Sequence, residues 1–217
     1  QSILNVKAHF MLIMGSDDYF TKNGINIIIE KINNNKTIKF FVFSTIIKGD
    51  KISSSETLKG IPVTNYISLR SDYKIKRDLK EVVDHKLICK FMYSRPKKIR
   101  RIPTSYLWFK ISKKVNCMPI FSNPVIVIEY SKDWMSKNLL PLKINNPKYI
   151  VLTYKMAIQN KNYASSFYRF KYTILFYRYS FHNKTSKLLK LIDIPFYFIG
   201  YIYSLYDNFR IDMFIKK

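Results

Sequence analysis

The sequence from Arg95 to Pro119 reads RPKKIRRIPTSYLWFKISKKVNCMP, and the rest of the chain is organised around it. Five cations lie in its first seven residues, an apolar run follows, and a second lysine cluster comes before its end. In an extended strand successive side chains point to opposite faces, so both faces of this stretch would carry cations and apolar groups. That pattern is typical of an exposed ribbon pressed against an anion. The alternative is a solvated loop with a few lysines.

The composition of the chain supports an anionic binding partner. The 217 residues include 38 Lys+Arg against 14 Asp+Glu, which gives a formal net charge of +24. Self-repulsion of this size opposes a compact state unless a polyanion neutralises it, so nucleic acid or an acidic membrane surface is the expected partner. With 47% hydrophobic and 16% aromatic residues the chain can bury a core, and we expect it to fold. No glycine-rich phosphate loop is present, so the sequence gives nucleotide hydrolysis no support.

The sequence contains only weak patterns of metal-binding or catalytic residues. Cys89 and Cys117 are isolated and are interpreted as buried thiols, and no histidine has a second ligand at a metal-binding spacing. We therefore expect no metal and no cofactor. Asp17, Asp18 and Glu30 are the only acidic residues of the first region that could suggest metal-dependent nuclease chemistry, but an Asp pair before an aromatic residue is more typical of a helix cap or turn. The sequence predicts that the chain is not an enzyme.

Residues 1–60 form a predicted N-terminal extension. The runs Ile25–Ile32 and Lys39–Ile47 are rich in β-branched and aromatic residues and are separated by a turn-like Asn-rich segment, which predicts a hairpin. The polar, Ser-rich stretch from Lys48 to Lys59 is a predicted linker. We therefore place a domain boundary near Gly60.

The pattern sharpens after this boundary. Alternating residues predict a strand over Ile61–Leu69, and apolar spacing predicts a helix from Ile75 to Leu87 with Ser71 or Asp72 as its cap. This helix should end before Pro96, because the residue before a proline avoids the α region. Later predicted elements are a strand at Pro124–Tyr130, a helix at Trp134–Leu142, a strand at Lys148–Met156, a last strand at Ile174–Phe181 and a closing helix at Lys187–Phe196.

The order of these elements resembles large-subunit ribosomal protein five, the family that binds 5S rRNA. The resemblance covers Ile61 to Phe196. Its matching segments are Ile61–Leu69, Ile75–Leu87, Arg95-Pro96, Arg100, Ser105, Phe109–Ile111, Met118–Ile120, Val125–Ile128, Trp134–Leu142 and Lys187–Phe196. The resemblance implies an α+β fold, in which an antiparallel sheet has helices packed on one face. Residues 61–196 would form the RNA-binding domain, between the extension 1–60 and a C-terminal extension 197–217.

The same resemblance implies a structural constituent of the central protuberance of the large ribosomal subunit, located in the mitochondrial matrix. Its implied partners are large-subunit rRNA including 5S rRNA, P-site tRNA and a small-subunit head protein, with no small-molecule substrate and no membrane insertion. The implied rRNA contacts are Arg70, Arg95, Lys97, Lys98, Arg100, Arg101, Ser105 and Lys110. The implied tRNA-proximal loop carries Lys113, Lys114 and Asn116.

Two alternatives stay open. Tyr106 or Trp108 could stack on an unpaired base, or Trp108 and Phe109 could belong to the core. The second alternative is an organelle-encoded membrane subunit of a respiratory complex. Leu188–Tyr206 is mostly apolar over about 19 residues, close to the ~20 needed to cross a bilayer. Lys190 and Asp193 lie inside that stretch and oppose its insertion.

Overall fold

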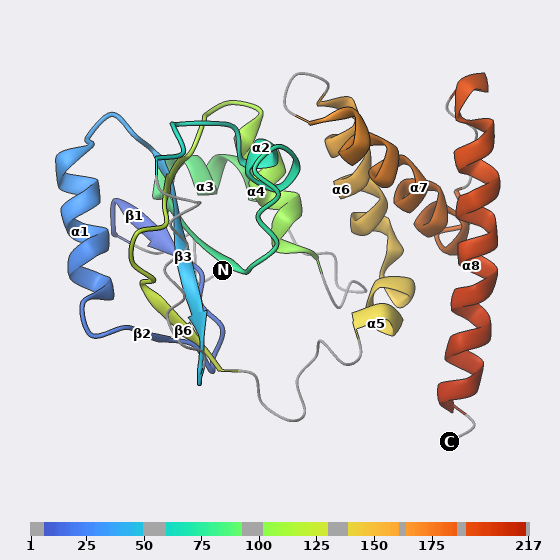
Figure 1. The fold of residues 1–217 in the computed structure, drawn as a ribbon, viewed down its shortest axis with the longest axis horizontal. Helices are drawn as coiled ribbons and strands as arrows, with labels where there is room; N and C mark the ends of the chain where they lie inside the picture. Colours follow the sequence, from blue (N-terminus) through green and yellow to red (C-terminus); the bar gives the residue numbers. More distant parts are fainter. Residues whose placement is uncertain are drawn as a thin grey trace. The chain divides into compact units, whose positions relative to one another are not determined.

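A computed structural model describes residues 7–49, 60–92, 102–129, 139–160, 164–185 and 190–215, with side chains as far as Arg210. The chain divides into two compact units, and Figure 1 shows their helices and strands. Unit 1 comprises Gln1–Met92 and Ile111–Lys132, and unit 2 comprises Tyr93–Lys110 and Asp133–Lys217. These limits differ from the domain ranges predicted from the sequence, which stay a prediction.

Unit 1 is built on a six-stranded sheet in the order β1-β4-β3-β6-β2, with β5 also beside β3. Strand β4 is antiparallel to β1 and β3, and β2 is antiparallel to β6, whereas β5 and β6 are parallel to β3. Phe40 of β3 pairs with Val83 of β4, and Thr45 pairs with Ile126 of β6. The strands are β1 Phe10–Leu12, β2 Tyr19–Phe20, β3 Phe40–Ile47, β4 Leu79–Asp84, β5 Met118–Ile120 and β6 Ile126–Ile128.

The central strand β3 is completely buried over Phe40–Phe43, because helices cover both faces of the sheet (Figure 1). On one face, Phe41 and Val82 pack with Ile28 of α1 (Gly24–Asn34) in a single apolar cluster. Burying side chains of this size stabilises a fold by about 1.5–3 kcal/mol each. This cluster is the core of unit 1.

The opposite face of the sheet packs against α2. Phe40 stacks on Tyr66, with ring centroids 5.6 Å apart. The side chain of Asn65 caps α2 by accepting a 3.0 Å hydrogen bond from the N–H of Ile67, and the side chain of Asp84 caps α3 in the same way. The short helices of unit 1 are α2 Tyr66–Ser71 and α3 His85–Phe91.

Unit 2 is helical in its described part. Its core is formed by α6 and α7 and includes Ile150, Val151, Phe176 and Tyr177. None of the helices in the described ranges is long and apolar enough to cross a membrane. The helices are α4 Thr104–Ser112, whose last two residues belong to unit 1, α5 Leu139–Asn145, α6 Pro147–Gln159, α7 Ser166–His182, the 3-10 helix η3 Leu191–Asp193 and α8 Ile194–Ile215.

The predicted fold class, α+β with helices packed against a sheet, is confirmed, and the sheet itself is mixed. The strands predicted at Lys39–Ile47 and Pro124–Tyr130 correspond to β3 and β6. The linker predicted from Lys48 to Lys59 lies almost wholly outside the described residues. The helix predicted at Trp134–Leu142 is described only from Leu139, where α5 begins.

Four predicted strands are wrong, because each segment forms a helix instead. Ile25–Ile32 lies in α1, Ile61–Leu69 runs into α2, Lys148–Met156 lies in α6 and Ile174–Phe181 lies in α7. Their β-branched and aromatic residues favour strands only weakly, and packing against the sheet or against another helix overrides that preference.

The helix predicted at Ile75–Leu87 is also wrong, because β4 occupies its middle. Val82 and Val83 are both buried although they are neighbours, since helices cover both faces of the sheet. The apolar residues of this strand, Leu79, Val82 and Val83, are therefore spaced i, i+3 and i+4, which imitates the spacing on one face of a helix.

Candidate functional site

The carboxyl ends of four strands meet at one edge of the unit 1 sheet. Strands β5 and β6 are parallel to β3, and β1 runs the same way because β1 and β3 are both antiparallel to β4. In open α/β sheets, ligands bind outside the carboxyl ends of parallel strands, where loops present polar groups. This edge, called the carboxyl edge below, is therefore the candidate site of unit 1.

The loop after β1 is held by a nearly buried ion pair. Asp18 Oδ2 accepts hydrogen bonds from the Nζ of Lys80 and, over 3.0 Å, from the backbone N–H of Gly15. The side chains of Lys80 and Asp18 are only 12% and 7% exposed. The interpretation of the acidic pair as a turn-former is confirmed for Asp18, whose carboxylate is committed to holding the loop.

Asp17 is different from its neighbour. A β-carbon added to Gly15 would lie 2.8 Å from Asp17 Oδ1, so the glycine gives this carboxylate room to lie close to the backbone. Within the described part of the chain, Asp17 makes no hydrogen bond or ion pair, and it is half-buried. Glu30 lies elsewhere, in α1, where it pairs with Lys31. Among the described residues, Asp17 thus offers a carboxylate at the carboxyl edge that no hydrogen bond or ion pair occupies, and it is called the uncommitted carboxylate below.

A second charged pair lies where β3 and β6 end. Lys48 Nζ is 2.7 Å from Glu129 Oε1, and both side chains are exposed. The hydrogen bond with Glu129, together with its charge, raises the pKa of Lys48. An exposed ion pair is weak, so Lys48 can exchange Glu129 for an anionic ligand at the carboxyl edge. In the order β1-β4-β3-β6, the strand before Lys48 and the strand before Asp17 are separated by β4.

A buried acid lies in β4 on the face covered by α2. Tyr66 Oη donates a hydrogen bond to Glu81, and burial raises the pKa of Glu81 to about 7. The nearby Arg70, one of the predicted rRNA contacts, donates from Nη1 to the carbonyls of Ile75 (3.0 Å) and Arg77 (2.7 Å). Arg70 therefore holds the turn that leads into β4.

The predicted basic ribbon is wrong from Thr104 onward, because α4 occupies Thr104–Ser112. Trp108 and Phe109 are 2% and 3% exposed, so the alternative that places them in the core is confirmed. Tyr106 meets Tyr149 edge-to-face, with ring centroids 5.1 Å apart. Trp108 and Phe109 are therefore used in packing, while base stacking by the partly exposed Tyr106 stays a prediction.

The other predicted nucleic-acid contacts fall into two groups. Ser105 and Lys110 lie on α4, and Lys113, Lys114 and Asn116 lie between α4 and β5. The remaining five lie outside the described residues: Arg95, Lys97, Lys98, Arg100 and Arg101. None of the five described residues belongs to the strands whose ends form the carboxyl edge.

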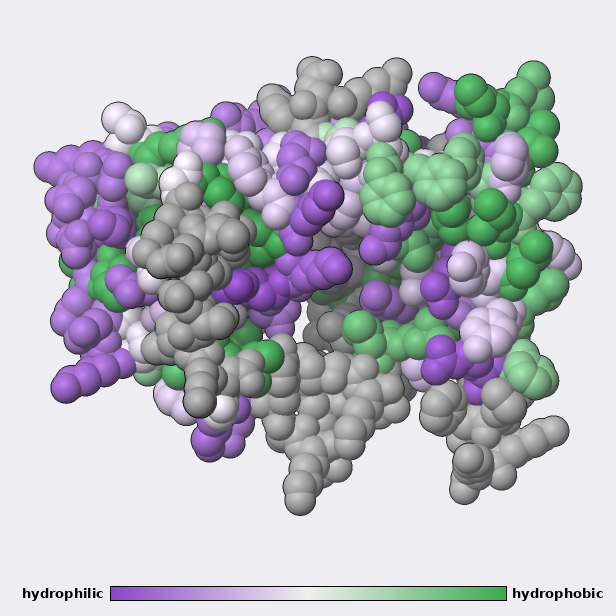
Figure 2. Space-filling model, in the orientation of Figure 1, coloured by the Kyte–Doolittle hydropathy of each residue, from purple (hydrophilic) through white to green (hydrophobic). Residues whose placement is uncertain are grey.

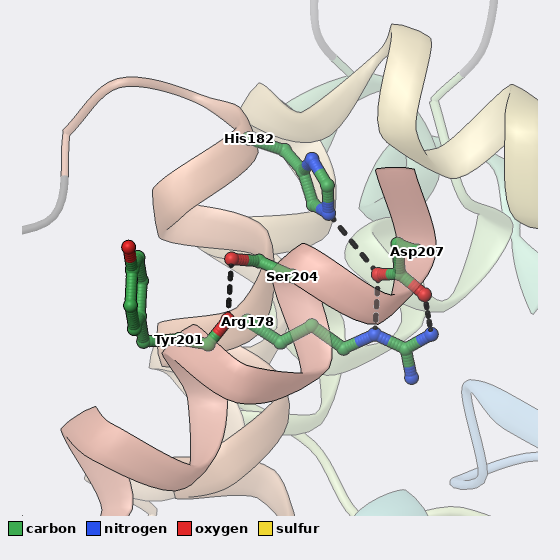
Figure 3. A network of polar contacts seen from close by, with 5 residues as sticks. All are labelled: Arg178, His182, Tyr201, Ser204 and Asp207. Carbon is green, nitrogen blue, oxygen red and sulfur yellow. Dashed lines mark hydrogen bonds and ion pairs between the residues drawn. The ribbon is translucent and has the colours of Figure 1, made fainter. Parts of the chain in front are cut away.

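Unit 2 contains a separate polar network between α7 and α8 (Figure 3). Asp207 is completely buried, and its carboxylate accepts hydrogen bonds from Nε of Arg178, over 2.7 Å, and from Nη2 of the same residue. His182 Nε2 lies 3.0 Å from Asp207 Oδ2. Burial opposes ionisation of Asp207, but the bonds with His182 and Arg178 outweigh it and hold its pKa below the ordinary value. The network fixes α8 on α7.

Comparison with known proteins rests on structure, since no protein-family model and no curated protein sequence matches the chain. The chain is similar in fold to the crystal structure of S. aureus TarS 1–349, with a TM-score of 0.52 and 14% identity over 95% of this chain. The structure of TarS 1–349 in complex with UDP-GlcNAc gives a TM-score of 0.51 and 11% identity over 92% of this chain. The chain spans 57% of the length of each.

These comparisons overturn the ribosomal interpretation. The fold follows TarS and not ribosomal protein five, and the elements on which the resemblance rested are different elements in the structure. The prediction that the chain is a structural constituent of the large ribosomal subunit is therefore wrong. The predicted rRNA, tRNA and ribosomal-protein partners are wrong with it. The respiratory membrane subunit has no support either.

The predictions that the chain is not an enzyme and takes no small-molecule substrate are overturned by the same finding, because one of the similar structures holds a nucleotide sugar. The residues assigned to nucleic acid lose the family that implied their roles, and any binding role for them stays a prediction. The mitochondrial location also stays a prediction.

Proposed function

We propose that this chain binds a uridine diphosphate sugar and takes part in glycosyl transfer. The observation that carries the proposal is the similarity in fold, over 92% of the chain, to TarS solved with UDP-GlcNAc. The net charge of +24 supports it, because a basic protein raises the local concentration of an anionic diphosphate.

The carboxyl edge is the proposed binding region. Magnesium is held in proteins by one or two carboxylates together with the phosphates of the substrate, and not by a full protein cage. The uncommitted carboxylate of Asp17 fits this need, and in the described residues no group of three or more His, Cys, Asp or Glu forms a closed metal site. A divalent ion would neutralise the diphosphate there. Lys48 would supply a further positive charge at the same edge.

Calorimetric titration of the whole chain tests the proposal. UDP and UDP-GlcNAc should bind in the presence of Mg²⁺, and ADP-glucose serves as the comparison ligand. Asp17→Asn should weaken UDP binding by about tenfold or more, since an interaction with a charged group contributes about 1.5–3 kcal/mol and 1.4 kcal/mol is tenfold. Its unfolding midpoint should stay close to that of the unmodified chain.

Asp18→Asn is the matched control, because it changes the neighbouring carboxylate that holds the loop. It should lower the unfolding midpoint, whereas Asp17→Asn should not. If the folded chain binds neither UDP nor UDP-GlcNAc at millimolar concentration, the function proposed here is wrong. If Asp17→Asn binds UDP as tightly as the unmodified chain, the assignment of Asp17 is wrong.

A further inference from the structure

The exposed side of α8 is strongly apolar. The inner side presents Gly200, Ser204 and Asp207, all of which are buried. The opposite side carries seven apolar or aromatic residues with exposed fractions between 41% and 65%: Ile194, Phe198, Tyr201, Ile202, Leu205, Tyr206 and Phe209. These seven are called the α8 stripe, and Figure 2 shows hydrophobic side chains over this helix. Contiguous exposed apolar surface of this kind marks an interaction site.

The spacing of the stripe favours another helix as its cover. Phe198, Ile202, Leu205 and Phe209 follow one another at intervals of four, three and four residues. These intervals average about 3.7 residues, close to the 3.6 residues of a helical turn, so the four side chains lie on one side of α8, where they can pack into the grooves of a facing helix. A second α8 presents the same spacing.

The polar groups around α8 do not suit a lipid surface. Helices that lie in a membrane interface carry Lys and Arg on their polar face. Asp207 of α8 is instead turned toward α7, where it is held by Arg178. Phe196 and Tyr197 also pack on that side. Arg210 is the only cation between positions 194 and 210, and its guanidinium lies 5.9 Å from the ring centre of Tyr206. The chemistry of the stripe therefore fits a protein surface with little charge.

We propose that two copies of this chain pair through the α8 stripe. A two-fold interface uses the same patch on both copies, so a single apolar stripe is complementary to itself. Ile202 lies near the middle of the stripe and meets the same residue of the second copy. With aromatic side chains of roughly 200 Å², the stripe presents on the order of 600 Å² per copy. The dimer would bury about 1,200 Å², at the lower end of specific interfaces.

Sedimentation equilibrium of the whole chain at tens of micromolar is the test, because an interface of this size gives roughly micromolar affinity or weaker. The unmodified chain should have the mass of a dimer. Ile202→Glu and Ile202→Lys should each be monomeric, since like charges then meet at the two-fold axis. An equal mixture of the two variants should recover the dimer. Phe167→Glu is the matched control, because Phe167 is 76% exposed on α7 and lies outside the stripe.

Several results would overturn the proposal. A monomeric unmodified chain shows that the stripe is covered by something else, and a dimeric Ile202→Glu variant places the interface elsewhere. A mixture of the two charged variants that stays monomeric excludes direct contact at Ile202. Circular dichroism establishes that each variant is folded. If the unmodified chain is monomeric and floats with lipid vesicles, and Ile202→Glu abolishes this flotation, the stripe binds lipid instead.

Discussion

Replacing Asp207 by Ala should destabilise unit 2 by about 3–5 kcal/mol, the range found when one partner of a buried ion pair is removed. Three contacts are lost: two from Arg178, one of them 2.7 Å long, and one from His182 at 3.0 Å. The side chains of Arg178 and His182 are only 18% and 6% exposed, so little water replaces the carboxylate. The cost comes mainly from leaving a guanidinium buried without its counter-charge.

Thermal and urea unfolding followed by circular dichroism measure this effect. For a chain of this length, each kcal/mol corresponds to roughly 2–4 °C in the unfolding midpoint, so the midpoint should fall by about 6–20 °C. Ser204→Ala is the matched control on the same inner face, where the hydroxyl donates a hydrogen bond to the carbonyl of Tyr201. It should change stability by less than about 1 kcal/mol.

A double variant and a pH series separate the ion pair from simple loss of packing. Arg178→Met with Asp207→Leu should regain most of the stability, because an apolar pair leaves no buried charge. The pKa of Asp207 is lowered from 3.8 in the folded chain, so the folded state binds fewer protons there. Its contribution is complete above the ordinary pKa and is lost as pH falls through the lowered value. An Asp207→Ala variant within about 1 kcal/mol of the unmodified chain at pH 7 would refute this reasoning.

Two further predictions concern packing and pH. Gly200→Ala should lower the free energy of unfolding by about 1–3 kcal/mol, because an added β-carbon would lie 2.6 Å from Cβ of Tyr177. This overpacking exceeds the ~1 kcal/mol by which Ala stabilises a helix relative to Gly. A gain in stability on urea unfolding would contradict the prediction. Glu81 should make the chain less stable as pH rises from its ordinary pKa near 4.5 through about 7, because its folded pKa is raised and the folded state binds the extra proton. Glu81→Gln should remove this part of the pH dependence, and equal pH profiles for variant and unmodified chain would count against the assignment.

Short apolar runs are compatible with both a strand and a helix, so the pattern of such a run does not by itself decide which one forms. The runs at β3 and β6 are predicted as strands because they are short, β-branched and continuous. Lys148–Met156 and Ile174–Phe181 carry similar residues but form α6 and α7, where Tyr177 and Val151 pack between helices. The resemblance to ribosomal protein five rests on the order of the predicted elements, and several of them are different elements in the structure. The ribosomal function that this resemblance implies is wrong for the same reason.

The sequence by itself determined that the chain folds, that it combines helices with a sheet, and that its strong positive charge suits an anionic ligand. It could not separate Asp17 from Asp18, because the two carboxylates are neighbours with the same chemistry. Only the tertiary structure brings Lys80, 62 residues away, to Asp18 and leaves Asp17 uncommitted. In the same way, the packing of α8 on α7 decides that Asp207 points inward and that Ile202 and Phe198 point outward. Local sequence carries the chemistry of each group, while the pairing of distant segments decides which groups remain available to bind.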